Sequence, residues 1–153
     1  MKLIAHRGNT NGRFEHHENE PTYIDLAIKK GYDVEVDVWY KDGILWLGHD
    51  KPDYGMDFRW FRDRVTKLWV HCKNVAAVIF FFDLFKIGVR INYFWHENDT
   101  LTLTSLGHIW VYPGKQPVPS SIAVMPEREN DTINQCIGVC SDYILNYQQN
   151  DQA

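Results

Sequence analysis

Apolar and polar residues alternate along the segment YDVEVDVWYKDGILWLGHD, residues 32–50. Val34, Val36 and Val38 occupy every second position, so they fall on one side of an extended chain. Glu35 and Asp37 fall on the opposite side. The Asp-Gly step that follows is typical of a tight turn. The pattern therefore predicts a hairpin whose second strand covers residues 44–47 and leads back to His49.

The rest of the first half alternates between short apolar runs and segments of helical spacing. Asn19 is a candidate helix cap with Pro21 in the first helical turn, and Asn74 is a candidate cap for a second apolar helix. The predicted strands are 2–5, 68–72 and 89–95, and the predicted helices are 21–30, a short segment after Asp57, and 75–86.

The second half of the chain shows a different pattern. Four short apolar runs there predict strands with little sequence between most of them, at residues 101–104, 109–112, 122–125 and 137–140. Only residues 127–135 leave space for a further helix. Residues 146–153 are polar and are predicted to be a frayed tail.

Alternating strands and helices predict parallel strand pairing through right-handed crossovers. Eight such units form a barrel, but a barrel usually takes about 250 residues, and this chain has 153. We therefore expect an α/β fold. The specific expectation is a shortened TIM-type (β/α) barrel, with helices in its first half and mostly loops in its second. No linker divides the sequence, so residues 1–153 are predicted to form a single domain.

Composition narrows the classes of partner. Hydrophobic residues make up 44% of the chain and charged residues 24%, which is ordinary for a globular protein, and the net charge is −4. An acidic balance argues against nucleic-acid binding through a basic surface, but it allows a small anionic ligand. The longest apolar run, 75–82, is too short to insert into a membrane. Three cysteines and no secretion signal favour a reduced, cytoplasmic protein.

Histidines, acids and cations gather at the ends of the predicted strands. In a barrel these ends meet at one rim, where catalytic groups sit. Two carboxylates at positions i and i+2 of a strand are costly to bury unpaired, so they suggest a shared cation or a pocket rich in positive charge. Taken alone, the acid pair fits a solvent-facing strand equally well. The residues at the predicted rim are His6, Arg7, Glu35, Asp37, His49, His71 and Lys73.

The order of motifs resembles the glycerophosphodiester phosphodiesterase family. The matching motifs are IAHRG at 4–8, EN followed by Thr22 at a helix entry, EVDV at 35–38, KDG at 41–43, and HD at 49–50. The strand before Lys73 matches less completely. Beyond residue 88 only GVCSD, residues 138–142, is similar to the family's last strand.

The resemblance implies a TIM barrel and a role for each matching residue. His6 and His49 would be the catalytic acid–base pair, and Arg7 and Lys73 would contact the substrate phosphate. Glu18, Glu35 and Asp37 would hold a divalent metal ion, Mg, Ca or Mn. The family commonly has a carboxylate two residues before the lysine, where this chain has His71.

The position of His71 is a departure with a chemical consequence. Strand alternation places it on the same side as Lys73, so we expect it to be a metal ligand beside the acids. Nitrogen ligands suit manganese and other transition metals better than magnesium or calcium. The sequence therefore predicts a preference for manganese or another transition metal, or weak magnesium binding.

The expected enzyme is a metal-dependent phosphodiesterase that hydrolyses a small glycerol-type phosphodiester. The metal and the two cations would neutralise charge on the phosphate, and the histidines would move protons. The sequence leaves open which histidine is the acid. It also leaves open a lyase that forms a cyclic phosphate, and a non-catalytic protein that binds a phosphate ligand. Further candidates for the rim, for which the sequence favours a structural role, are His96, Glu97, Asp99, Trp95, Trp110, Glu127 and Asp142.

Overall fold

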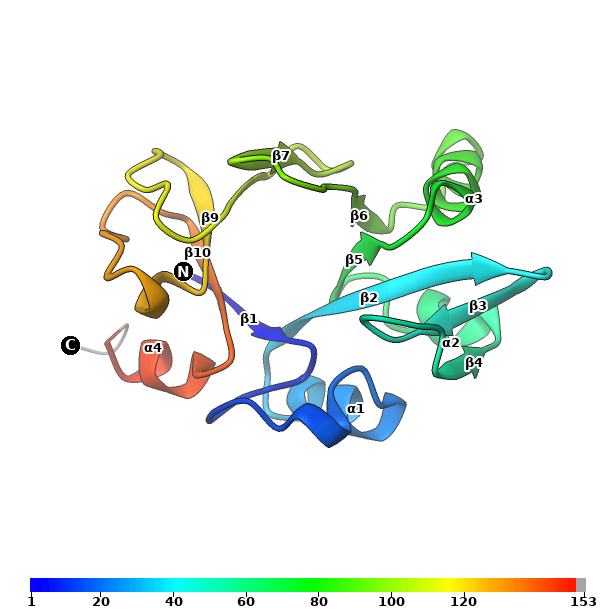
Figure 1. The fold of residues 1–153 in the computed structure, drawn as a ribbon, viewed down its shortest axis with the longest axis horizontal. Coiled ribbons are helices and arrows are strands. Elements are labelled where there is room, and N and C mark those ends of the chain that lie inside the picture. The colour runs from blue at the N-terminus through cyan, green and yellow to red at the C-terminus, as the bar shows by residue number, and fades with distance from the viewer. Residues whose placement is uncertain (151–153) are drawn as a thin grey trace.

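The computed structural model describes residues 1–150, and the side chains of residues 1–148. Ten strands form one mixed sheet that curls into a half-barrel (Figure 1). The strands are β1 (Lys2–His6), β2 (Asp33–Lys41), β3 (Ile44–Leu47), β4 (Tyr54–Met56), β5 (Leu68–Cys72), β6 (Asn92–Phe94), β7 (Leu101–Leu103), β8 (Ile109–Val111), β9 (Ser121–Val124) and β10 (Gly138–Ser141). The helices are α1 (Pro21–Lys29), α2 (Phe58–Arg62), α3 (Val75–Lys86) and α4 (Ile144–Asn150), with 3₁₀ turns η1 (Glu15–His17) and η2 (Pro126–Arg128).

The centre of the sheet is parallel and its additions are antiparallel. Parallel ladders run in the order β6-β5-β2-β1-β10-β9-β8. Antiparallel ladders attach β3 to β2, β4 to β3 and β7 to β8. Between β6 and the residues after β7 the contact is local: Ser105 donates its backbone N–H to the Tyr93 carbonyl at 2.8 Å, and its Oγ accepts from Tyr93 N at 2.9 Å.

The predicted TIM-type barrel is therefore wrong. A TIM barrel has a helix after every strand, whereas the described part of this chain has four short helices and a mixed sheet. β2 continues for nine residues and folds back as an antiparallel hairpin instead of leading into a helix. In the second half, loops and the short turn η2 connect β8, β9 and β10 in place of helices. No helix in residues 1–150 is long and apolar enough to cross a membrane.

Three local predictions also need correction. The predicted helix at 127–135 is only the short turn η2. Residues 146–150 of the predicted tail belong to α4, while residues 151–153 lie outside the described part. The strand β4 was not predicted. Asn19 does not cap α1, because the N-cap is Glu20 and it makes no side-chain capping bond.

Two apolar clusters cover the two faces of the sheet. The larger cluster packs the outer face of β2 against α1, α2 and α3, and its largest members are Phe61 and Phe81. The smaller cluster includes Trp69, Phe94 and Trp110. Trp69 lies two residues before His71 on β5, so this smaller cluster shares its face of the sheet with the polar residues described below.

Asn74 caps α3 as the sequence predicted, and it also ties the helix to β2. Its Oδ1 accepts hydrogen bonds from Ala77 N at 3.0 Å and Tyr40 N at 3.2 Å, and its Nδ2 donates to the Tyr40 carbonyl at 3.0 Å. Asn74→Ala removes all three bonds. We expect it to lower the free energy of unfolding by about 2 kcal/mol, the upper end of the range for a lost cap.

Urea unfolding of Asn74→Ala beside Asn74→Asp would measure this loss. The aspartate keeps the acceptor for Ala77 but loses the donor to the Tyr40 carbonyl, so it should recover only part of the stability. Equal stability of Asn74→Ala and the parent protein would show that the cap contributes nothing.

Candidate active site

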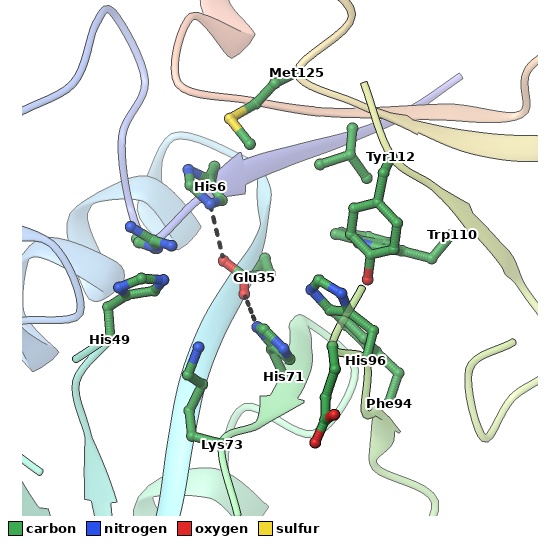
Figure 2. A pocket seen from close by; sticks show the side chains of 13 residues that line it. His6, Glu35, His49, His71, Lys73, Phe94, His96, Trp110, Tyr112 and Met125 are labelled. Atoms are coloured by element: carbon green, nitrogen blue, oxygen red, sulfur yellow. Dashed lines mark ion pairs between the residues drawn. The ribbon is translucent and has the colours of Figure 1, made fainter. Parts of the chain in front are cut away.

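A cavity of about 450 Å³ opens at the carboxyl ends of β1 and β5 and beside the first half of β2. One wall carries polar residues of these strands and of the segments that follow β1, β3 and β5, and Glu35 lies between His6 and His71 at its centre (Figure 2). The opposite wall comes from β6, β8 and β9. The lining residues are His6, Arg7, Glu35, His49, His71, Lys73, Phe94, His96, Glu97, Trp110, Tyr112, Val124 and Met125.

The structure brings most of the predicted site residues to this cavity. Six of the eight line it, namely His6, Arg7, Glu35, His49, His71 and Lys73. Asp37 is fully buried and contacts Arg7, His71 and Lys73. Glu18 lies in an adjoining hollow, which it shares with Arg7 and His49.

Asp37 is paired with cations on both of its oxygens. Arg7 Nε lies 2.9 Å from Oδ2, while His71 Nδ1 lies 3.0 Å and Lys73 Nζ 3.6 Å from Oδ1. Burial acts to raise the pKa of Asp37, but His71, Arg7 and Lys73 outweigh burial and hold this pKa well below its usual value. Asp37 is therefore a carboxylate that stays ionised.

Asn19 holds Asp37 in place from behind. Its Nδ2 donates to Asp37 Oδ2 at 2.9 Å, and its Oδ1 accepts from Asp37 N at 2.9 Å. Asn19 is almost fully buried and has a left-handed backbone, with φ of 63°. Asparagine tolerates this conformation better than most residues. The Glu18-Asn19 motif thus supplies a support for the acid, and not the helix cap that the sequence suggested.

Glu35 has an unsatisfied oxygen in a buried position. It is 3% exposed, and its Oε2 has no hydrogen-bond partner. His6 Nε2 lies 3.9 Å from Oε2, and His71 Nδ1 lies 3.7 Å from Oε1. Burial and the neighbouring charge of Asp37 raise the pKa of Glu35. An orphaned carboxylate oxygen in a cavity wall indicates a position for a ligand.

His6 is oriented by Asp142, which comes from the far end of the chain. Asp142 Oδ1 lies 2.7 Å from His6 Nδ1 and also accepts a hydrogen bond from Asn9 Nδ2 at 2.9 Å. The parallel ladder of β1 with β10 brings these groups together. With Nδ1 engaged, Nε2 faces Glu35. Sequence reasoning left Asp142 as one of several candidates, and the signal for it was the GVCSD motif.

His49 follows β3 and reaches the same cavity, as the hairpin predicted. Its Nδ1 lies 2.7 Å from Asp50 Oδ1. Partial burial and the charges of Arg7 and Lys73 lower the pKa of His49, so its ring is neutral near pH 7. A neutral imidazole at the cavity wall is able to accept a proton.

Glu18 is placed differently from the predicted metal ligands. Its carboxylate accepts hydrogen bonds from Arg7 Nη1 at 3.1 Å, Asn9 Nδ2 at 3.0 Å and Arg13 Nε at 3.1 Å. These donors satisfy both oxygens. Glu18 therefore anchors Arg7 in this structure, and its predicted contact with a metal ion has no geometric support.

Glu35, Asp37 and His71 form a group that fits a metal ion. One potential ligand atom from each lies within 4.8 Å of the others. Two hard carboxylates and one imidazole are a donor set suited to manganese or zinc as well as magnesium. The unpartnered Oε2 of Glu35 supports the fit, while the ion pairs of Asp37 show that Arg7 and Lys73 compete for the same position.

The opposite wall contains residues that the sequence only partly identified. The His96 ring lies 4.6 Å from the His71 ring and 4.0 Å from the Tyr112 ring, measured between centroids. Burial, His71 and Lys73 lower the pKa of His96 to about 4, so it is neutral near pH 7. Trp110 lines the cavity and Trp95 does not. Glu127 bonds Ser141 and Tyr147, which indicates a structural role.

His71→Glu tests whether the imidazole sets metal preference. A third carboxylate adds negative charge and a hard oxygen, so we expect magnesium and calcium to bind at least about tenfold more tightly, while manganese changes less. Calorimetric titration of each metal would measure this. His108→Glu, outside the lining of the cavity, is the control. Identical affinities before and after the His71 change would place His71 outside the metal's ligands.

Comparisons with known proteins add no further constraint. No family model matches the sequence, and neither a curated protein nor a solved structure matches it. The function of the chain is therefore inferred from the residues of the cavity and their chemistry.

Proposed function

We propose that the chain is a phosphodiesterase that cleaves a small glycerol-type phosphodiester with the help of a divalent metal ion. The observation that carries the proposal is the convergence of two histidines, an arginine and a lysine around a buried glutamate in one cavity. The resemblance of residues 4–50 to glycerophosphodiester phosphodiesterases belongs to the same proposal, because its motifs supply all of these residues except Lys73.

Arg7 and Lys73 would bind the phosphate. The anionic oxygens of a phosphodiester repel a nucleophile, so catalysis depends on positive charge placed where negative charge develops. Both side chains line the cavity and are largely shielded from solvent, at 13% and 17% exposed. Shielding strengthens their electrostatic effect on a bound anion. A divalent ion held by Glu35, Asp37 and His71 would add Lewis-acid stabilisation of the phosphoryl oxygens.

The two histidines would move the protons. His49, which is neutral near pH 7, is suited to take the proton from the attacking water or hydroxyl. His6, held through Nδ1 by Asp142, presents Nε2 to the cavity and would deliver a proton to the departing alkoxide. Each positioned transfer is typically worth ~10²–10⁴ in rate.

A panel of glycerophosphodiesters tests the proposal, each incubated with magnesium, calcium or manganese. We expect release of an alcohol and a phosphomonoester, fastest with manganese. Phosphorus NMR of the products separates hydrolysis from the lyase alternative, because a persistent cyclic phosphate indicates attack by a hydroxyl of the substrate itself. No cleavage of any diester with any of the three metals would refute the enzyme and leave a binding protein.

A further inference from the structure

Asp37 and a bound anion compete for the two cations of the cavity, while Glu18 also holds Arg7 at 3.1 Å. Arg7 and Lys73 are paired with Asp37, at 2.9 and 3.6 Å. They are also the only arginine and lysine among the residues that line the cavity, so any anion bound there depends on them. Arg7 and Lys73 cannot fully serve both partners, because a cation that turns toward a bound anion moves away from Asp37.

Asp37 cannot lose these partners without replacement. Its side chain has no exposed surface, so water cannot compensate its charge. Asn19 and His71 would remain within hydrogen-bond distance of its oxygens, but neither carries a permanent charge. Release of Arg7 and Lys73 toward an anion therefore leaves a buried carboxylate that favours a new cation.

Glu35 shows where that cation would sit. Its Oε2 is buried without a hydrogen-bond partner, and its carboxylate lies in the same group of potential ligand atoms as Asp37 and His71. This group of ligand atoms lies next to the two competing cations, and the protein alone supplies no hydrogen-bond partner for Glu35 Oε2.

We infer that the cavity binds a divalent cation and a phosphate-like anion as a coupled pair, by exchange of partners around Asp37. When Glu35, Asp37 and His71 hold a divalent cation, Arg7 and Lys73 are no longer needed to balance Asp37 and bind the anion. The inference rests on the metal-assisted chemistry proposed above. By thermodynamic linkage, each ligand tightens the other by the same factor.

Calorimetry on the full chain tests this exchange without any turnover. The probes are Mn²⁺ and sulfate, which has the tetrahedral shape of phosphate and complexes Mn²⁺ only weakly in solution. We expect saturating sulfate to raise Mn²⁺ affinity by about 5- to 150-fold, the usual range of coupling between two sites. Saturating Mn²⁺ should raise sulfate affinity equally. Unchanged affinities, or no Mn²⁺ binding with or without sulfate, would overturn the inference.

Two variants that each remove one cation test the exchange through their affinity for Mn²⁺. Arg7→Gln and Lys73→Met each remove a competitor for Asp37, so Mn²⁺ alone should bind more tightly than it binds the parent chain. Sulfate should then add little further tightening. The matched controls are Arg64→Gln and Lys67→Met, whose cations pair with Asp25 and Asp33 and do not line the cavity. Both controls should leave the Mn²⁺ and sulfate affinities unchanged.

The Mn²⁺ affinities of these variants either support or overturn the exchange. Circular dichroism establishes that each variant is folded, and Lys73→Met alone decides if Arg7→Gln does not fold. Weaker Mn²⁺ binding by Lys73→Met would overturn the exchange. Coupled binding without cleavage of any diester would refute the proposed enzyme but leave the exchange intact. Cleavage with uncoupled binding would refute only the exchange.

Discussion

His6→Asn is expected to lower kcat for cleavage of a glycerol-type phosphodiester by about 10²–10⁴, the usual contribution of one positioned proton transfer. In the parent chain His6 Nδ1 lies 2.7 Å from Asp142 Oδ1. The asparagine amide keeps a hydrogen-bond donor for this carboxylate. It removes Nε2, the ring atom that faces the cavity. The variant therefore separates loss of proton transfer from loss of the buried contact. Steady-state kinetics with a single diester would measure the effect.

His16→Asn is the matched control for His6→Asn. His16 is exposed on the turn η1 and does not line the cavity, so its replacement should leave kcat within about twofold. Full activity of the His6 variant would remove His6 from the proton-transfer scheme. No cleavage by the parent chain itself, together with intact ligand binding, would favour a protein that binds phosphate esters without cleaving them.

Asp37→Asn is expected to lower the free energy of unfolding by about 3–5 kcal/mol, because it leaves the positive charges of Arg7 and Lys73 without their buried partner. Arg7 retains Glu18 at 3.1 Å, which favours the lower end of this range. Denaturant unfolding would measure the change. The control is Asp83→Asn, since Asp83 forms an exposed pair with Lys86 on α3 and should change stability by no more than about 1 kcal/mol.

The pH dependence of this difference has a defined sign. The folded pKa of Asp37 is depressed, so its contribution is complete above the unfolded pKa of about 3.9 and is lost as the pH falls further. The gap in stability between the parent chain and Asp37→Asn should therefore shrink as the pH falls below about 4. A gap that stays unchanged between about pH 5 and about pH 2 would contradict the assignment to Asp37.

Local sequence patterns were sufficient to predict most strands and helices in the first half of the chain. The strands at 44–47 and 68–72 and the helix at 75–86 match the predicted boundaries, because alternation, the Asp-Gly turn and the Asn74 cap are local signals. The same signals delivered Glu35, His49 and Lys73 to one cavity.

The secondary structure of the second half depends on contacts between residues that are distant in the sequence. Residues 127–135 leave space for a helix, but only the short turn η2 forms there. Met125 and Asn130 have left-handed backbones, and Glu127 accepts hydrogen bonds from Ser141 and Tyr147. These partners lie on β10 and α4. No window of the sequence contains both sides of such contacts, so periodicity alone cannot weigh them.

The same limit explains why the roles of Asp142 and Asn19 were not predicted. Asp142 contacts His6 across 136 positions of the chain, and Asn19 contacts Asp37 across 18. Asn19 also had a local interpretation, as a helix cap. Asp142 was one of several candidates for the rim, and its one further signal was the resemblance of residues 138–142 to the last strand of the family.

The pairing of β1 with β10 also has a consequence for the order of folding. β1 lies between β2 and β10, and its partners on β10 are residues 138–141. Contacts of such high contact order are slow to form, because the entropy of closing a long loop is lost before the pairing is gained. During synthesis, β1 and β2 would emerge from the ribosome long before β10. His6 would then lie beside Glu35 without its partner Asp142 until β10 pairs with β1. The site would therefore be completed in the last step of folding.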